Sequence, residues 1–197
     1  MRERKAMGRP REFDTDAALE RIMSVFWARG FDGASMADLV DATGLKKGSL
    51  YAAFGDKRAM YHQALARYDR IHIDAAVCGL SGKARPRARI DAFLQSAIDE
   101  RTGRGDPRGC FVCNAAIDQA PVDPAAEKLV RVSLGRLETA LAATIANDGD
   151  GSTTAERRQA RHLMSVYFGL RVLARAGAAP AVLSDAKRAA LQTLDRV

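Results

Sequence analysis

Cysteine, histidine and long apolar runs are scarce in this sequence of 197 residues. Its three cysteines, Cys78, Cys110 and Cys113, are too few for a disulfide framework, which favours a reducing, cytoplasmic location. No apolar run approaches the roughly 20 residues that a membrane span needs, so no membrane contact is expected. The basic N-terminal stretch is followed by no apolar segment, so a secretory signal is not expected either.

The signatures of catalysis, metal binding and cofactor binding are also missing. The sequence contains no nucleophile elbow and no phosphate-binding glycine loop. The Cys110-x-x-Cys113 pair lacks the βαβ pattern of a thioredoxin-like enzyme around it. His62, His72 and His162 have no spacing that would join this pair in a metal site. We therefore expect no enzyme, no metal and no cofactor.

What the sequence does have is positive charge and helical periodicity. The net charge is +7 and the sequence pI is about 9.7, which makes an anionic partner plausible. Charge alone does not choose between nucleic acid, membrane and an acidic protein. Apolar residues, 47% of the chain, recur at helical spacing nearly throughout, and no alternating strand pattern is present. The sequence therefore predicts an all-α fold of about nine helices.

The first third of the chain predicts three short helices and a longer fourth. Candidate N-caps are Asp14 or Thr15, Ser35 and Asp56, and Gly30 is expected to end the first helix. The turn Thr43-Gly44 joins the second helix to a third over residues 45–54. Two short helices with a glycine-containing turn, here at about residues 34–54, form a helix-turn-helix, whose second helix enters the major groove of DNA.

The third helix carries exposed donors in the stretch GLKKGSLYAAFGDK. Lys46 and Lys47 at its start can reach phosphates or guanine edges, and Gly48 lets the backbone approach DNA closely. Ser49 and Tyr51 can donate to phosphate. The alternative is an ordinary solvated charged face. The whole ordered pattern favours DNA binding.

From Phe13 to Tyr68 the sequence resembles the N-terminal domain of the tetracycline-repressor (TetR) family. The motifs are an aromatic first helix ending in RGF, a hydroxyl residue before the second helix, and a G-[LV]-x-[KR]-G-[ST]-[LF]-Y-x-x-F-x-x-K core. The resemblance implies phosphate contacts by Ser35 and Lys57. It implies that the recognition helix reads DNA through Lys47, Gly48, Ser49 and Tyr51.

The same resemblance implies the organisation of the whole chain. We expect a flexible basic arm at 1–12, a DNA-binding domain at 13–68 and a ligand-binding and dimerisation domain at 69–197. The function implied is that of a transcription regulator: a homodimeric repressor on a palindromic operator in double-stranded DNA, released by a small-molecule effector. In the arm, Arg9-Pro10-Arg11 has the pattern of an AT-hook, and a basic tail that only adds affinity is the alternative.

The last two predicted helices, from Thr154 to about Ala176 and from a cap at Ser184 onward, are the candidate dimer faces. One apolar stripe joins Leu163, Val166 and Leu170, and another joins Leu191 and Leu194. Packing within one protomer is the alternative interpretation of both stripes.

The segment RGCFVCNAAID begins a short apolar helix and carries two thiols on one face. A helix N-terminus and the nearby Arg108 would lower a thiol pKa, so Cys110 and Cys113 could form a sensor of oxidants or electrophiles, or the working pair of a cytosolic redox protein. Two small buried hydrophobes are the favoured alternative. For an apolar effector pocket the candidate lining residues are Phe93, Cys110, Cys113, Ile117 and Tyr167, with Asn114 as a polar handle.

Overall fold

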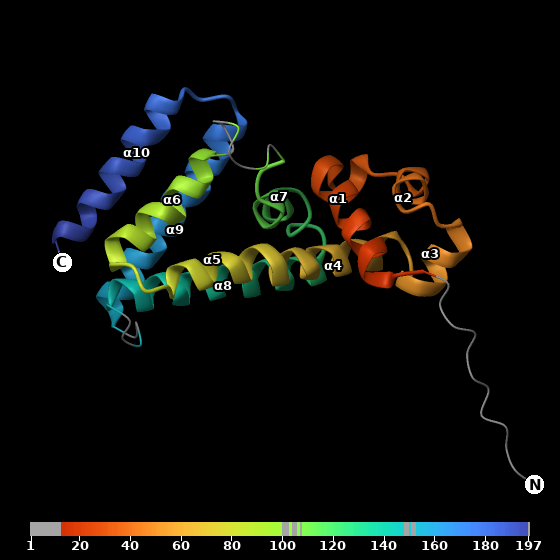
Figure 1. Cartoon of the computed structure of the whole chain (residues 1–197), viewed down its shortest axis with the longest axis horizontal. Coiled ribbons are helices and arrows are strands. Elements are labelled where there is room, and N and C mark those ends of the chain that lie inside the picture. The colour runs from red at the N-terminus through yellow and green to blue at the C-terminus, as the bar shows by residue number, and fades with distance from the viewer. Residues whose placement is uncertain are drawn as a thin grey trace, which may run out of the picture.

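The computed structural model describes residues 13–99, 103, 106, 108–147, 150 and 153–196. All regular structure in this part of the chain is helical, which confirms the all-α prediction (Figure 1). The first helices are α1 (Thr15–Gly33), α2 (Met36–Thr43), α3 (Lys47–Phe54) and α4 (Lys57–Tyr68). α4 continues through a π-helical segment, η1 (Asp69–Ile73), into α5 (Asp74–Leu80). There follow α6 (Pro86–Asp99), α7 (Phe111–Asp118), α8 (Pro124–Ile145), α9 (Thr154–Arg175), α10 (Pro180–Gln192) and a 3-10 segment, η2 (Thr193–Arg196).

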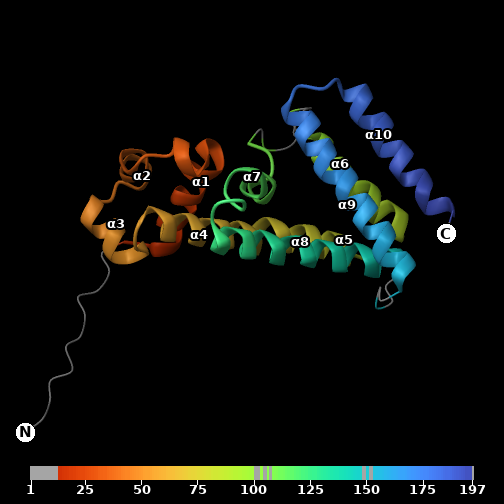
Figure 2. The ribbon, with the colours of Figure 1, turned by 180° about the vertical axis from the view of Figure 1, so that it is seen from behind.

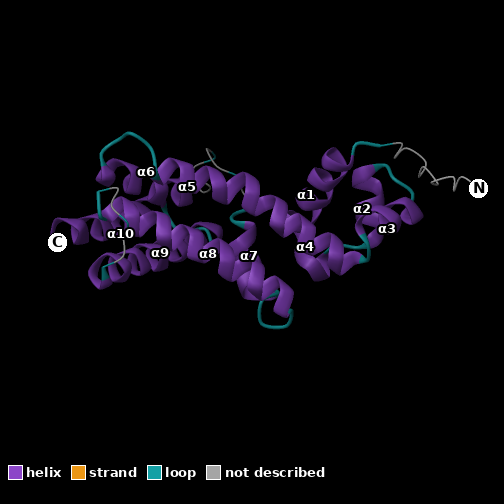
Figure 3. Ribbon diagram, turned by 90° about the horizontal axis from the view of Figure 1, so that it is seen from below, coloured by secondary structure: helices purple, strands orange, loops and turns teal. Residues whose placement is uncertain are grey.

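The molecule is elongated, with two groups of helices joined by a long rod. We call α1 to α4 the head and α5 to α10 the body. Figures 1 and 2 show the head at one end, with α4, η1 and α5 running from it as one rod and α8 lying beside that rod. α6, α9 and α10 pack together at the far end of the body, and α7 lies at the end of the body that is next to the head. Figure 3 shows the same helices from below.

The head folds because each of its helices has a cap and an apolar face. Asp14 caps α1, accepting from the backbone N–H groups of Asp16 and Ala17, as predicted. Asp56 caps α4 through the N–H of Ala59, at 2.7 Å. The buried core of the head comes from all four helices: Ile22, Met23, Phe26, Leu39, Leu50, Phe54, Met60 and Tyr61. α1 packs mainly on α4, so α2 and α3 lie outward at the tip.

The body is built around α8 and α9, which start at strong caps. Asp123 caps α8, whose first residue is Pro124, a residue that favours the first helical position. Thr153 and Glu156 form a capping box at the start of α9. The apolar residues of α6 are buried: Ile90, Phe93, Leu94, Ala97 and Ile98. None of the helices formed by the described residues is long and apolar enough to cross a membrane.

Two predicted helix boundaries are wrong. The last helix begins at Pro180 with Ala179 as its N-cap, so Ser184 lies inside α10. Proline favours the first helical position and overrides the weaker hydroxyl signal four residues later. α3 begins at Lys47 rather than Leu45, and Lys46 is its N-cap. The predicted break at Gly30 is confirmed, because Gly30 adopts a non-helical conformation with φ 70° at a kink, beyond which a short helical stretch of α1 continues to Gly33.

The assignment of the leucine stripes to dimer faces is also wrong for most of their residues. Leu163 and Leu170 are 0% and 1% exposed, and Leu191 is buried as well, so all three pack inside one protomer. Val166 and Leu194 are half-buried. α9 carries apolar residues on both its inner and its outer side, with Val172 and Leu173 exposed. Periodicity alone therefore could not tell which side faces the protomer's own core.

Candidate functional site

The turn between α2 and α3 is fixed by local chemistry, and this positions α3 at the tip of the head. The Ser35 hydroxyl accepts from the Asp38 N–H while the Asp38 side chain accepts from the Ser35 N–H, which is a capping box. The Ser35 hydroxyl, then its backbone N–H, hold the pKa of Asp38 below its usual range. At the other end of α2, Gly44 adopts φ 70°, a conformation that glycine enters without strain.

α3 presents one polar face outward and one apolar face inward. Leu50 and Phe54 are buried. Lys46 and Lys47 are exposed, and the Tyr51 ring is 41% exposed. The Lys47 ammonium lies 5.8 Å from the centre of that ring. Ser49 is half-buried, so the outer face of α3 gathers two cations and a phenol on one turn and a half of helix.

Gly48 occupies the middle of this exposed face. A Cβ atom added there would meet no atom of the protein within 4 Å, and the residue is not among those with positive φ. Neither packing nor backbone conformation therefore requires glycine here, although glycine costs a helix roughly 0.5–1 kcal/mol relative to alanine. A second molecule that approaches the α3 backbone closely would require glycine at this position.

A second set of cations lies beside α3 at the start of α4. The Lys57 ammonium is 4.5 Å and the Arg58 guanidinium 4.9 Å from the centre of the Phe31 ring. Stacking on an aromatic face holds the Lys57 cation in a defined position without neutralising it. Arg58 was not singled out from the sequence, because its place beside Phe31 depends on the packing of α1 on α4. The predicted contacts Arg9 and Arg11 lie outside the described residues.

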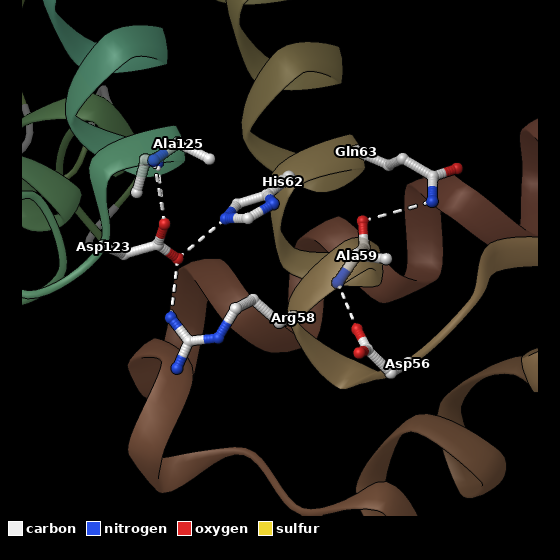
Figure 4. Close-up of polar contacts among 8 residues, drawn as sticks. Asp56, Arg58, Ala59, His62, Gln63, Asp123 and Ala125 are labelled. Atoms are coloured by element: carbon white, nitrogen blue, oxygen red, sulfur yellow. Dashed lines mark hydrogen bonds and ion pairs between the residues drawn. The ribbon is translucent and has the colours of Figure 1, made fainter.

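Asp123 links the head to the body (Figure 4). Its carboxylate accepts from Arg58 and contacts His62 Nε2, both at 2.7 Å, and it also caps α8 through Ala125 and Ala126. Burial would raise the pKa of Asp123, but the contacts with His62, the Ala126 N–H and Arg58 outweigh it and lower the pKa to about 2. One buried carboxylate thus joins the first turns of α4 and α8.

α7 makes a second link between head and body. The Phe111 ring packs edge-on against Tyr61 and Tyr68 of α4, with ring centres 5.5 and 5.8 Å apart. Just before it, the Gly109 carbonyl accepts from the Trp27 indole N–H of α1 at 3.0 Å. Arg108 stacks on the same indole, 3.9 Å from the ring centre. A shift of α7 would therefore be felt by both α1 and α4.

A partly open cavity of about 310 Å³ lies between the body and the rod. Three predicted pocket residues line it, namely Phe93, Cys110 and Tyr167. The other lining residues are Tyr68, His72, Ile73, Ala76, Gly79, Leu80, Arg89, Ala92, Ser96, Leu137 and Arg171. His72 and Ile73 belong to η1, and a π-helical turn inside an α-helix often marks a functional site.

The remaining predicted pocket residues lie elsewhere. Cys113, Asn114 and Ile117 line a second, more open hollow of about 410 Å³ between α7 and α9, and Ile117 is 68% exposed. The Asn114 amide oxygen accepts from Arg175 at 2.6 Å in that hollow. Asn114 is therefore not the polar handle of the cavity beside the rod. Arg89 and Arg171, which the sequence did not indicate, are the charged groups there, because helical periodicity does not distinguish a buried arginine from an exposed one.

Cys110 is the N-cap residue of α7 and lies in the cavity wall. The Cys113 thiol lowers the pKa of Cys110; burial opposes it, while the Cys113 N–H and the Tyr68 hydroxyl add to it, giving a pKa of about 7. The contact with Cys110, together with burial, raises the pKa of Cys113. Arg108, which the sequence placed beside the thiols, instead pairs with Asp106 at 2.6 Å. Among the described residues no group of histidine, cysteine and acidic side chains is arranged to hold a metal ion.

Comparison with known proteins identifies relatives of this arrangement. Residues 18–64 match the family model described as bacterial regulatory proteins, tetR family. The chain is 38% identical over 122 residues to the HTH-type transcriptional repressor ComR of Escherichia coli (strain K12), a match that covers 60% of this chain and 57% of that protein. It is 28% identical over 194 residues to the uncharacterized HTH-type transcriptional regulator YezE of Bacillus subtilis (strain 168), covering 96% of this chain and all of that protein.

A solved structure extends the likeness over nearly the whole chain. It is a cysteine mutant of the TetR family transcriptional regulator CifR in complex with 26-bp double-strand operator DNA. The identity is 32%, the match covers 94% of this chain and 98% of that one, and the TM-score is 0.77.

Proposed function

This chain belongs to the TetR family of bacterial regulatory proteins, and from that premise we propose that it is a homodimeric repressor, which binds a palindromic operator and leaves it when a small molecule fills the cavity. The family places it among DNA-binding regulators of transcription rather than enzymes. Its place of action would be the cytoplasm, with the chromosome. The observation that carries the proposal is the exposed face of α3, with Lys46, Lys47 and Tyr51 around a glycine that nothing in the protein requires.

In this proposal α3 lies in the major groove of DNA, and cations beside α3 bind the phosphate backbone of the DNA. Lys47, Ser49 and Tyr51 contact phosphates or base edges from the exposed face. Lys57 reaches a phosphate from its position over the Phe31 ring. The Ser35 hydroxyl is bonded to Asp38 at the start of α2. In this proposal the N-terminus of α2, beside Ser35, faces another phosphate. The residue ranges 13–68 and 69–197 then serve as DNA-binding and as ligand-binding and dimerisation domains, although one rod crosses their boundary.

For the dimer contact we propose the outer face of α9 and α10. Val172, Leu173 and Val182 are 51%, 43% and 54% exposed, and the half-buried Val166 lies on the same side of α9 as Leu173. Gly169, between them, leaves open space in which a Cβ would meet nothing of the protomer. A second copy of the chain would bury this apolar surface, and a two-fold axis there would place two α3 helices for a palindrome.

Release of DNA would use the rod. The cavity is lined by Tyr68 of α4 and by His72 and Ile73 of η1, while Lys57 begins the same continuous helix. A ligand that favours a tilted rod would move Lys57 and the rest of the head relative to the body. A hundredfold weakening of DNA binding needs about 2.7 kcal/mol of differential affinity between the two states.

The experiment that tests this function is a selection of bound sequences from random double-stranded DNA, followed by footprinting. The expected result is a palindrome whose half-site centres lie about one helical turn apart or slightly more. A protein that selects no sequence above background, or protects a single half-site, would contradict the proposal.

The low pKa of Cys110 favours a second candidate, in which thiol chemistry replaces ligand binding as the release signal. A peroxide would accept the two electrons: the Cys110 thiolate forms a sulfenic acid, which the Cys113 thiol attacks to give a disulfide and water. The double variant Cys110→Ser, Cys113→Ser decides between the two. If a mild oxidant releases operator DNA from the wild type but not from this variant, and a reductant restores binding, the thiols are the sensor. Equal behaviour of the two proteins would exclude it.

A further inference from the structure

The side chains of α3 form an unusual set for a helix that reads bases. Its sequence, KGSLYAAF, contains no asparagine, glutamine, aspartate or glutamate, and no arginine or histidine. Asparagine and glutamine amides make the paired contacts to adenine, and carboxylates accept from the amino group of cytosine. Both of these means of recognition are therefore missing from α3.

The polar groups that α3 does carry are hydrogen-bond donors. The Lys47 ammonium lies beside the Tyr51 ring on the exposed face, and the Ser49 hydroxyl is half-buried. Donors suit phosphates, and they also suit the acceptors that guanine, adenine and thymine all present in the major groove. A donor alone therefore does not tell thymine from a purine. What distinguishes thymine in this groove is its C5-methyl group, which is recognised by apolar contact.

Ala52 is the exposed aliphatic side chain of α3. Leu50 and Phe54 point into the core of the head, and Ala53 is half-buried against that core. Ala52 lies one turn after Gly48, so the two residues share a side of the helix. An alanine methyl group is short and makes contact only when the helix backbone comes close to the DNA. Because Gly48 has no side chain and open space around it, such an approach is possible on this side.

We propose that Ala52 is a specificity-determining residue, which packs against the C5-methyl group of one thymine in each half-site of the operator. The inference rests on the proposed function, since it takes α3 as the helix that lies in the major groove. The contact would remove two methyl groups from water. One buried methyl group corresponds to a change in affinity of about fourfold.

The first test removes the methyl group from the DNA and needs only the wild-type protein. Each thymine of the selected operator is replaced in turn by uracil, symmetrically in both half-sites. Uracil keeps the hydrogen-bonding groups of thymine and lacks its methyl group. At one position the affinity measured by gel shift should fall about fourfold per half-site, or about 15-fold for the pair. An operator on which no uracil has this effect would overturn the proposal.

A pair of variants then identifies the residue that contacts the methyl group. Ala52→Gly should bind the thymine and uracil operators equally, because the alanine side of the contact is gone. Ala53→Gly is the matched control, since it places the same backbone cost in the same helix while its side chain packs on the core. It should keep the wild-type difference between the two operators. Circular dichroism checks that both variants are folded. A difference that persists in Ala52→Gly, or that disappears in Ala53→Gly, would overturn the assignment to Ala52.

Failure of this inference and failure of the proposed function give different results. A protein that selects no operator contradicts both. A protein that binds a palindromic operator, but binds its thymine and uracil forms equally, keeps the proposed function and loses only the role of Ala52.

Discussion

The head packs large aromatic rings against one another, whereas the body keeps a cavity of about 310 Å³ among its helices. In the head, Tyr61 meets Phe26 and Phe31 edge-on, each with ring centres 5.3 Å apart. In the body, the cavity lies against Phe93, Tyr167 and two arginines. A tightly packed unit moves as a whole, while a unit with a cavity can change shape when the cavity is filled. The two regions are therefore suited to different tasks, presentation of a rigid surface and response to a ligand.

The contacts between the head and the body determine whether a change of shape in the body reaches the outer surface of the head. The rod, Asp123 and α7 all join the body to α4, and α7 also contacts α1 through Gly109 and Trp27. This division of tasks can be tested by removing the proposed contact of the body with a second copy, by removing the Asp123 link between head and body, or by altering the surface of the head alone.

The largest effect is expected from Val172→Glu on the outer face of α9. A charge in an apolar dimer contact should dissociate the dimer and lower operator affinity at least about 100-fold, equal to about 2.7 kcal/mol. Val132→Glu on α8 is the matched control, because both valines are 51% exposed. Sedimentation velocity gives the oligomeric state and gel shift gives the affinity. A Val172→Glu protein that stays dimeric would show that this face is not the interface.

Cutting the link with Asp123→Ala should lower the free energy of unfolding by about 2–4 kcal/mol, because Arg58 and His62 lose their partner and α8 loses its cap. Asp185→Ala is the control, since that side chain is 70% exposed and pairs with Arg188 on its own helix. Urea denaturation at pH 7 measures both. A loss no larger than that of the control would mean that the link contributes little to stability.

The Asp123 carboxylate also makes the stability of the folded protein depend on pH in acid. Its pKa is lowered from 3.8 to about 2 in the folded protein, so its contribution is complete above pH 4 and is lost as the pH falls toward 2. The shift corresponds to about 2 kcal/mol. Stability measured against pH should therefore fall less steeply over this window in Asp123→Asn than in the wild type. Parallel curves for the two proteins would contradict the assignment.

At the surface, Lys47→Ala and Lys57→Ala should each weaken binding to all DNA sequences alike. Each loss of a phosphate contact should flatten the slope of log affinity against log salt by about one unit. Lys83→Ala removes an equal charge from an exposed site between α5 and α6 and should leave the slope unchanged. If both head variants keep the wild-type slope, α3 and the start of α4 do not contact the backbone.

The smallest effect is expected at Gly48, where one substitution should change stability and DNA binding in opposite directions. Gly48→Ala should stabilise the head by about 0.5–1 kcal/mol and yet weaken operator binding, because the added methyl group meets only the DNA. Gly135→Ala, at a glycine of α8 that also has open space around it, should stabilise without any effect on DNA. Unchanged binding by Gly48→Ala would remove the argument for close approach at this residue.

Much of the head could be predicted from the sequence because its determinants are local. Asp14, Ser35, Gly44 and Asp56 act within one turn of their own position, and each does what its residue type predicts. Four of the residues proposed to contact DNA, namely Lys47, Gly48, Ser49 and Tyr51, lie on one short helix, so their nearness follows from their positions in the sequence.

The body could be predicted less well because its determinants are distant in sequence. Leu163 and Leu170 fit an outer stripe as well as an inner one, and only the packing of α6 and α8 on α9 decides between them. Asn114 and Phe93 both looked like pocket residues, yet they line different cavities. Arg171 gives no signal in the sequence, since its place in the cavity wall depends on the packing of other helices around α9.

The contact of Trp27 with the body makes the molecule its own optical probe. The chain contains a single tryptophan, and its indole lies where the head meets the body, donating to Gly109 beneath the Arg108 guanidinium and beside His72. Indole emission responds to the charges and the solvent around the ring, so displacement of the head from α7 would change its wavelength and intensity. Dissociation from DNA could then be followed in real time, in unlabelled protein, through the fluorescence of Trp27.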